Sequence, residues 1–221
     1  MNHRPMLTSA VLLALTLIGG TTCAGYEDDW WAPRATNPVP AGAGVRLTSD
    51  RSDYFIGENV LLNFVLENAG TEPFEASFGG DYRGSPRHLR FRIQATRADG
   101  AVAADPYPHP FCMGGIGGPI TLRPGEQHCT SLPLMRYCQI EEPGVYAIRV
   151  AHGFGWRADE RPRPGGEIQL AFRVPTPAEA EQVVARMEAL SDDPNSTGGQ
   201  SAPDYADFSC LRHPAYLEPL L

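Results

Sequence analysis

The stretch YFIGENVLLNFVLENAG, residues 54–70, decides the fold of this chain. Apolar side chains recur in it with a period of two, at Val60, Leu62, Phe64 and Leu66. An extended strand with this spacing places all of them on one face, whereas Asn63 and Glu67 turn to the other face. Gly57 precedes the run and Gly70 follows it, and such turn-forming residues mark the ends of strands. The stretch therefore predicts a half-buried β-strand.

The same alternation returns at intervals through the central part of the chain. Alternating apolar residues occupy 89–95, 145–150 and 168–174, and Asp99-Gly100 after the first run is a strong hairpin signal. Several short strands with turn signals between them are typical of two antiparallel sheets packed face to face. Residues 45–175 are therefore predicted to form an antiparallel β-sandwich, which makes the chain mainly β.

Two single residues add detail to this prediction. Pro133 lies in the strand that carries Leu132, and proline within a sheet is confined to edge positions because it lacks an N–H group. We therefore expect this strand at an edge. Tyr146 opens the penultimate strand, where sandwich folds place a tyrosine whose hydroxyl group bonds to backbone a few residues upstream.

Residues 1–24 have the three parts of a secretory signal. Basic residues precede an apolar run that begins at Met6, and small residues lead up to Ala24. Cleavage between Ala24 and Gly25 would release the chain into the periplasm or the extracellular space. The alternative is a lipoprotein anchored at Cys23, although the residues before it depart from the bacterial lipobox. We expect no transmembrane segment after signal removal, because a span needs roughly 20 apolar residues.

The composition narrows the class of partner. The formal net charge of −8 and the sequence pI of about 5.2 argue against nucleic acid and anionic membranes, because both would repel the chain. The 23 glycines and 21 prolines suit many turns rather than long helices. Residues 25–44 are rich in Pro, Ala and Gly and have no regular period, which predicts a flexible leader.

A helical tail is predicted from residue 176 to residue 221. Thr176-Pro177-Ala178-Glu179 forms a capping box, in which Thr176 caps the helix and Glu179 reaches back to the cap amide. An apolar stripe with helical spacing follows, and two further helical pieces are expected at 204–211 and from Pro214 onward.

Four cysteines remain after signal cleavage, which permits three disulfide pairings. Cys129 and Cys138 lie at opposite ends of one predicted strand, which makes a bridge between them the least favourable. Cys112 and Cys138 could share one edge of the sandwich, so we expect that pair and, by exclusion, a second bridge between Cys129 and Cys210. The oxidising compartment beyond the inner membrane favours both bridges.

No motif for catalysis or cofactor binding stands out. Neither the Gly-x-Ser-x-Gly elbow nor the His-Glu-x-x-His helix occurs, so we predict that the protein is not an enzyme and needs no cofactor. A soft-metal cluster is a weaker hypothesis, because its residues match no known ligand spacing and disulfides would remove the thiolates. Its members would be His109, Cys112, Met113, His128 and Cys129.

The turn and core residues together resemble a known class of module. Tyr54-x-x-Gly57-Glu58, Pro124-Gly125-Glu126 and Pro143-Gly144-x-Tyr146 are similar to the pattern of Ig-like or fibronectin-like modules in bacterial secreted proteins, over residues 45–174. Macroglobulin-type domains and a family of Ig-like proteinase inhibitors share this pattern. The segment 207–221 resembles the start of a HEAT-type repeat. The resemblance implies an Ig-like antiparallel β-sandwich with a short C-terminal helical extension.

The signal segment, the missing catalytic motifs and this resemblance together favour an exported, non-enzymatic module. The main hypothesis is a module for protein binding or envelope structure, with an unidentified protein partner. The loops Cys112–Pro119 and Gly153–Gly166 are the predicted recognition sites, because sandwich loops carry recognition on a rigid frame. The alternative is a proteinase inhibitor that acts through an exposed loop.

Overall fold

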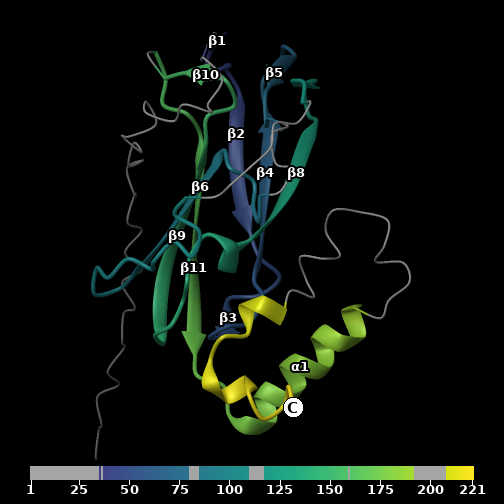
Figure 1. Ribbon diagram of the computed structural model, residues 1–221. Coiled ribbons are helices and arrows are strands. Elements are labelled where there is room, and N and C mark those ends of the chain that lie inside the picture. Colours follow the sequence, from purple (N-terminus) through teal and green to yellow (C-terminus); the bar gives the residue numbers. More distant parts are fainter. Residues whose placement is uncertain (1–34, 36, 80–84, 110–116, 159, 192–207) are drawn as a thin grey trace, which may run out of the picture.

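The computed structural model describes residues 35, 37–79, 85–109, 117–158, 160–191 and 208–221. Its two principal sheets have the strand orders β3-β11-β9-β6 and β2-β4-β8 (Figure 1). Two-stranded sheets, β1-β10 and β5-β7, extend one end. The strands are β1 (Asn37–Pro38), β2 (Ala43–Thr48), β3 (Asp53–Phe55), β4 (Leu61–Asn68), β5 (Phe74–Ala76), β6 (Phe91–Arg97), β7 (Ile120–Leu122), β8 (Gln127–Pro133), β9 (Gly144–His152), β10 (Trp156–Arg157) and β11 (Gly165–Arg173). The helices are α1 (Pro177–Ser191) and the 3₁₀ turns η1 (Leu134–Arg136), η3 (Phe208–Cys210) and η4 (Pro214–Tyr216).

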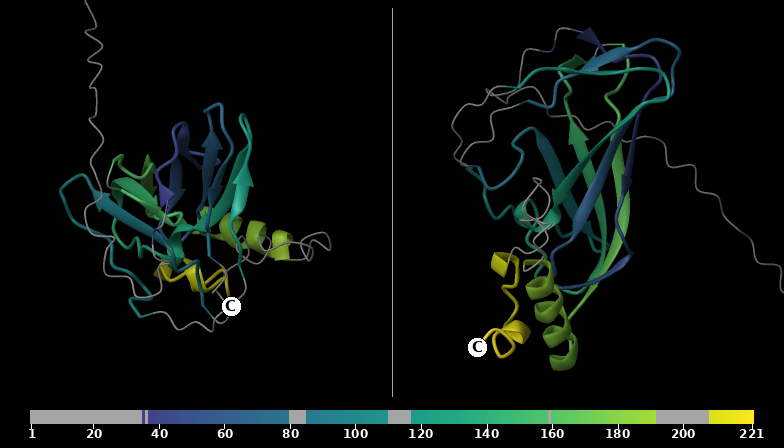
Figure 2. Two further views of the ribbon diagram at one scale, coloured as in Figure 1. Left: turned by 90° about the horizontal axis from the view of Figure 1, so that it is seen from above. Right: turned by 90° about the vertical axis from the view of Figure 1, so that its right-hand side faces the viewer.

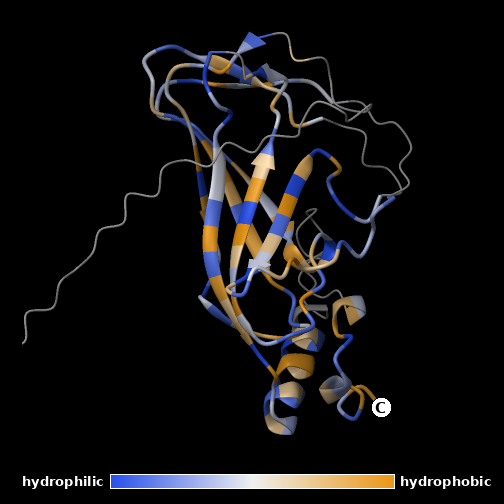
Figure 3. Cartoon of the chain, turned by 90° about the vertical axis from the view of Figure 1, so that its left-hand side faces the viewer, coloured by the Kyte–Doolittle hydropathy of each residue, from blue (hydrophilic) through white to orange (hydrophobic). Residues whose placement is uncertain are grey.

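The two principal sheets enclose one hydrophobic core. Phe64 of β4 and Ile148 of β9 are both fully buried in it, and bands of apolar and polar residues alternate along the strands (Figure 3). The prediction of an Ig-like β-sandwich with a C-terminal helical extension is confirmed. One detail differs, because Leu61 and Val65 on the opposite face of β4 are buried as well.

The sheets are joined along one side by a strand that changes partner. β2 runs antiparallel to β4, and after a short bend the same chain continues as β3, which runs parallel to β11 in the other sheet. Leu47 of β2 lies so close to Gly166 of β11 that a side chain at Gly166 would collide with it. This side of the sandwich is therefore closed, and β6 and β8 form the edges of the other side.

Several local predictions are confirmed. The Tyr146 hydroxyl group donates to the Glu142 carbonyl oxygen over 2.9 Å, as a tyrosine corner requires. Gly100 follows Asp99 with a φ of +91°, and the Arg97 N–H donates to the Ala101 carbonyl oxygen across this turn.

The tail docks on one end of the sandwich, opposite β1 and β10 (Figures 1 and 2). The fully buried Tyr216 donates its hydroxyl hydrogen to the Ile56 carbonyl oxygen over 2.9 Å. Gly57 beside it has a φ of +79°, and a side chain there would meet the Tyr216 ring. Glu58 is 3% exposed and accepts hydrogen bonds from both Arg51 and Arg186 of α1. The Ile56–Glu58 turn therefore anchors the tail as well as ending a strand.

The tail is helical where the sequence predicts it, over the described residues. The Glu179 carboxylate accepts from the Thr176 N–H over 2.9 Å, which confirms the capping box and the start of α1. The two further helical pieces are confirmed over their described residues as single 3₁₀ turns: η3 lies within 204–211, η4 begins at Pro214, and both pack against α1. A HEAT-type unit needs a second α-helix, and the described tail has none.

The N-terminal predictions fall mainly outside the described residues, including the signal cleavage between Ala24 and Gly25 and the anchor at Cys23. The flexible leader predicted for 25–44 is wrong at its end. Asn37–Pro38 pair with β10 as β1, and β2 begins at Ala43, because these residues find backbone partners that their composition did not reveal. None of the helices in the described part combines the length and apolarity that crossing a bilayer requires.

The predicted disulfide between Cys129 and Cys210 does not occur among the described residues, and the predicted bridge between Cys112 and Cys138 lies partly outside them. Cys129, Cys138 and Cys210 all carry thiol groups, and Cys112 lies outside the described residues. The bridge between Cys129 and Cys210 fails because Cys129 lies opposite Val65 within β8, whereas Cys210 packs beside Gly57 at the end of the sandwich. The Cys138 thiol lies 3.5 Å from the Ile93 carbonyl oxygen, and burial raises its pKa to about 12.

Candidate functional site

β8 has one edge bonded to β4. At one end of this ladder the Asn68 N–H donates to the Glu126 carbonyl oxygen over 3.0 Å, and beyond the other end the Leu134 N–H donates to the Val60 carbonyl oxygen over 2.9 Å. Antiparallel partners exchange hydrogen bonds at every second residue. The register between these two points is unbroken, so the residues of β8 that bond to β4 are His128, Thr130 and Leu132.

The other edge of β8 has no neighbouring strand in the described part of the chain. The alternate residues Gln127, Cys129 and Ser131 direct their N–H and C=O groups toward this edge. Pro133 ends the strand and offers no N–H group. The edge position predicted from Pro133 is therefore confirmed, and Figure 1 shows β8 as the outermost strand of its sheet.

The side chains of β8 follow the same alternation. Leu132 is fully buried in the core, whereas Gln127 and Cys129 are exposed on the outer face. No residue between 127 and 133 carries a formal charge at neutral pH, because burial lowers the pKa of the one titratable base, His128. This combination gives an uncharged edge of unpaired backbone groups, which is a template for another strand.

The edge of β6 on the same side of the sandwich is covered by the chain itself. The Ala103 N–H donates to the Ala95 carbonyl oxygen over 2.9 Å, and the Arg97 N–H donates to the Ala101 carbonyl oxygen over 2.8 Å. The Ile93 carbonyl oxygen accepts from the Cys138 thiol. Of the outward-facing residues of β6, Ala95 and Arg97 therefore have backbone partners, and Ile93 has a side-chain partner.

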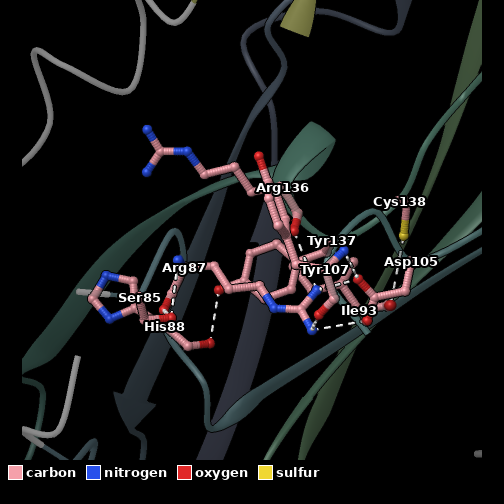
Figure 4. Close-up of polar contacts among 9 residues, drawn as sticks. All are labelled: Ser85, Arg87, His88, Ile93, Asp105, Tyr107, Arg136, Tyr137 and Cys138. Carbon is pink, nitrogen blue, oxygen red and sulfur yellow. Dashed lines mark hydrogen bonds and ion pairs between the residues drawn. The ribbon is translucent and has the colours of Figure 1, made fainter. Parts of the chain in front are cut away.

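Arg87 binds the segment that covers β6, residues 101–105, which is called the β6 cover below (Figure 4). Its guanidinium group forms two hydrogen bonds with the Asp105 carboxylate, of 2.7 and 2.8 Å, and also donates to the carbonyl oxygens of Tyr107 and Arg136. It lies 4.9 Å from the centre of the Tyr137 ring. One side chain thus ties the covering segment to the turn after β8.

Aromatic rings fill the gap between β6 and β8. The Phe78 ring lies 4.6 Å from the His128 ring of β8 and 5.1 Å from the His152 ring, and Phe91 of β6 lies 4.6 Å from His152. His152 is 1% exposed, and its Nδ1 accepts a hydrogen bond from the Phe154 N–H over 2.9 Å. Its Nε2 is buried, and none of the described residues forms a hydrogen bond with it.

This environment keeps His152 uncharged. Burial lowers its pKa from 6.5 to about 3, and the nearby positive charge of Arg90 acts in the same direction. Because His152 has no access to solvent or to a ligand, it serves the packing of this gap rather than proton transfer.

A small pocket lies where the tail meets the sandwich. Its volume is about 220 Å³, and its lining includes Ile56, Tyr107, Arg136, Glu141 and Arg212. Ligand pockets usually span about 300 to 1,000 Å³. Side chains of both charges line it, so it selects neither anions nor cations. We therefore do not place the functional site there.

The two loops predicted as recognition sites are not supported as binding surfaces by their described residues. In the loop Gly153–Gly166, Phe154 and Trp156 are buried in the core, and the Trp156 indole N–H donates to the Glu75 carbonyl oxygen over 2.8 Å. Of Cys112–Pro119, only residues 117–119 belong to the described part. The hypothetical metal set is not assembled among the described residues, because the His128 ring packs at a tilt against Phe78 while Cys129 is exposed. Cys112 and Met113 lie outside the described residues.

Sequence reasoning missed the open edge as a site. The available signals were Pro133, which was interpreted as an edge marker, and the absence of charge from residue 127 to residue 133. What it could not show is that the edge of β6 is covered and that of β8 is not.

Comparison with known proteins does not assign the chain to a family. No family model matches the chain, and no curated protein matches it. Among solved structures, the sporulation control protein Spo0M from Bacillus subtilis is 16% identical with a TM-score of 0.35, covering 68% of this chain and 56% of its own. A CARDB domain from Pyrococcus furiosus is 8% identical with a TM-score of 0.34, covering 64% of this chain and 98% of its own. A β-glucosidase from Erythrobacter marinus is 12% identical with a TM-score of 0.30, and the match covers 60% of this chain and 15% of the enzyme.

Proposed function

We propose that this protein is an exported, non-enzymatic interaction module that binds an extended protein segment along the outer edge of β8. The observation that carries the proposal is the contrast at the two strand edges. Ala95 and Arg97 of β6 have backbone partners in the segment 101–103, whereas no strand of the described part of the chain lies beside the outer edge of β8. An extended segment that joins a sheet gains main-chain hydrogen bonds, and its alternate side chains supply specificity.

The chemistry of the edge favours a protein segment over other ligands. Three residues, Gln127, Cys129 and Ser131, offer N–H donors and C=O acceptors at the spacing of a strand. No charge on β8 attracts nucleic acid, and the chain carries a net charge of −8. A neutral or basic extended segment therefore meets the fewest obstacles.

A non-enzymatic role is supported by the position of the buried titratable groups. Glu58 is held between two arginines beneath the tail, and His152 is enclosed by aromatic rings. Neither lines the pocket beside the tail. The proteinase-inhibitor alternative has less support, since it requires an exposed loop held by disulfides and both Cys129 and Cys138 are thiols.

Site-specific photo-crosslinking in the native host tests the binding edge. A photoreactive phenylalanine analogue at Cys129 is expected to give discrete adducts with another protein chain. The matched control is Val102, which is 56% exposed and belongs to the segment that covers β6. Adducts at Cys129 but not at Val102 support the proposal, whereas an equal yield at both positions, or none at Cys129, contradicts it.

Export is tested separately. The mature chain is expected outside the cytoplasm with Gly25 as its first residue, which N-terminal sequencing of fractionated cells would detect. A lipid-modified Cys23 would establish the anchored alternative, and a cytoplasmic chain that retains residues 1–24 would remove export from the proposal.

A further inference from the structure

We infer that the segment bound by β8 is β8 of a second copy of this chain, in an antiparallel arrangement around a two-fold axis at Cys129. This inference rests on the proposed function, because it uses the same edge and names the partner. A two-fold contact requires that the same surface complement itself. The outer edge of β8 satisfies this requirement in three respects: spacing, charge and side-chain size.

The spacing of the outward-facing residues is symmetric. With the axis at Cys129, Gln127 of one copy lies opposite Ser131 of the other, and Cys129 lies opposite its own equivalent. All three pairs then have their N–H and C=O groups directed at each other, which gives about six interchain hydrogen bonds at Cα separations of about 5.5 Å. Pro133 lacks an N–H group and ends the ladder just beyond Ser131.

The charge distribution also tolerates self-pairing. A symmetric contact places each side chain near its own kind, so a charged strand repels itself. β8 has no formally charged residue, and His128 is uncharged at neutral pH. β6, in contrast, carries Arg92 and Arg97, in addition to being covered by the chain.

The side chains on the outer face leave room for a second strand. Gln127, Cys129 and Ser131 are small or polar, and Gln127 can hydrogen-bond to Ser131 of the second copy. Opposite them, the buried side chains of β8 remain in the core of their own sandwich. Two three-stranded sheets would thus become one continuous sheet.

Sedimentation of the purified mature chain under reducing conditions tests the inference. The wild type is expected to be a dimer, and Cys129→Ser, which keeps size and neutrality, is expected to remain one. Cys129→Glu and Cys129→Lys each place two like charges face to face on the axis. Each variant alone should dissociate at least about tenfold more readily, because like charges in an interface are strongly unfavourable.

Mixing the two charged variants is the decisive step. Glutamate then faces lysine on the axis, so the mixture is expected to form a heterodimer that is at least about tenfold tighter than the homodimer of either variant. A wild type that stays monomeric up to about 1 mM overturns the inference. A dimer that forms equally well in both charged variants also overturns it, because its interface must then lie elsewhere.

The outcomes separate this inference from the proposed function. Crosslinked adducts at Cys129 that contain a different protein, together with a monomeric purified chain, would remove the second copy as partner and leave the strand-binding function intact. Adducts of twice the mass of the chain support both.

Discussion

The strands β6 and β8 are the edge strands on the same side of the sandwich, yet their outer edges have different surroundings. At β6, the chain returns through 101–104 and supplies backbone partners to Ala95 and Arg97. At β8, the outward groups of Gln127, Cys129 and Ser131 meet no strand in the described residues. Exposed sheet edges promote association, and natural proteins usually cover or charge them. An edge left bare beside one that is covered indicates a binding surface.

The segment that covers β6 is held in place by several separate interactions. It requires a hairpin at Asp99-Gly100, the ion pair between Arg87 and Asp105, and the aromatic packing of Tyr137 under Arg87. Over the part of the chain that the structure describes, β8 has no comparable arrangement. The difference between the two edges therefore depends on several contacts of the segment that covers β6, and each of them can be removed by substitution.

The largest effect is expected where a substitution breaks the bonded side of β8. Thr130→Pro removes an N–H group that the register directs at Phe64, so it leaves a buried acceptor without a partner. We expect a loss of at least about 3 kcal/mol in the free energy of unfolding. Cys129→Pro, one residue away, removes an outward N–H group and should cost less than about 1 kcal/mol. Urea unfolding at low protein concentration measures both, and equal losses would refute the assignment of bonded and outward residues.

Acid should loosen the aromatic packing between the two edges. The folded-state pKa of His152 is about 3, well below its ordinary value of 6.5. The unfolded chain therefore takes up a proton as the pH falls below 6.5 and the folded chain does not, so stability is full above 6.5 and declines toward pH 3. Between pH 7 and pH 4.5 the free energy of unfolding should fall by about 2 to 3 kcal/mol.

The matched control for this prediction is His152→Asn. The asparagine side-chain oxygen can still accept from the Phe154 N–H but does not titrate. This variant is expected to be less stable at pH 7, because the smaller side chain leaves a gap, and to lose most of the decline with acid. A variant with an undiminished decline would assign the effect to other groups, among them His88 and His128, whose pKa values burial also lowers.

Removing the fastener of the β6 cover should have a smaller effect. Arg87→Ala deletes the paired hydrogen bonds to Asp105, which is partly exposed, and we expect a loss of about 2 kcal/mol. Hydrogen exchange should accelerate at the Arg97 and Ala103 amides, because both bond within the cover. Arg87→Lys keeps the charge without the planar fork and should give an intermediate result. Unchanged exchange at these amides would show that the cover does not depend on Arg87.

The smallest effect on stability is expected at the outer edge of β8 itself. Gln127→Lys adds a charge to an exposed side chain and should change the free energy of unfolding by less than about 0.5 kcal/mol. Val102→Lys, on the covered side, should do the same. The two variants should differ in the strength of their dimerisation, because only the lysine at position 127 lies on the outer edge of β8. Sedimentation of both variants gives this comparison.

The sequence predicted the local features that depend on neighbouring residues. Alternation in β4, the turn at Gly100 and the capping box at Thr176 each lie within a few residues of the groups they bond to. The disulfide prediction failed because it required knowing which distant strands meet. The last segments are helical as predicted, but the sequence did not show that they would be single 3₁₀ turns, because packing against α1 contributes to their conformation.

By itself, the sequence determined that two β-sheets share an apolar interior. Alternate side chains of a strand lie on one face of its sheet, and the apolar faces of two sheets are removed from water when they pack against each other. Pro133 further limited its strand to an edge. Only the tertiary structure decided which edge is bare. That outcome depends on the path of the chain after β6 and on contacts such as Arg87 with Asp105, which no local pattern encodes.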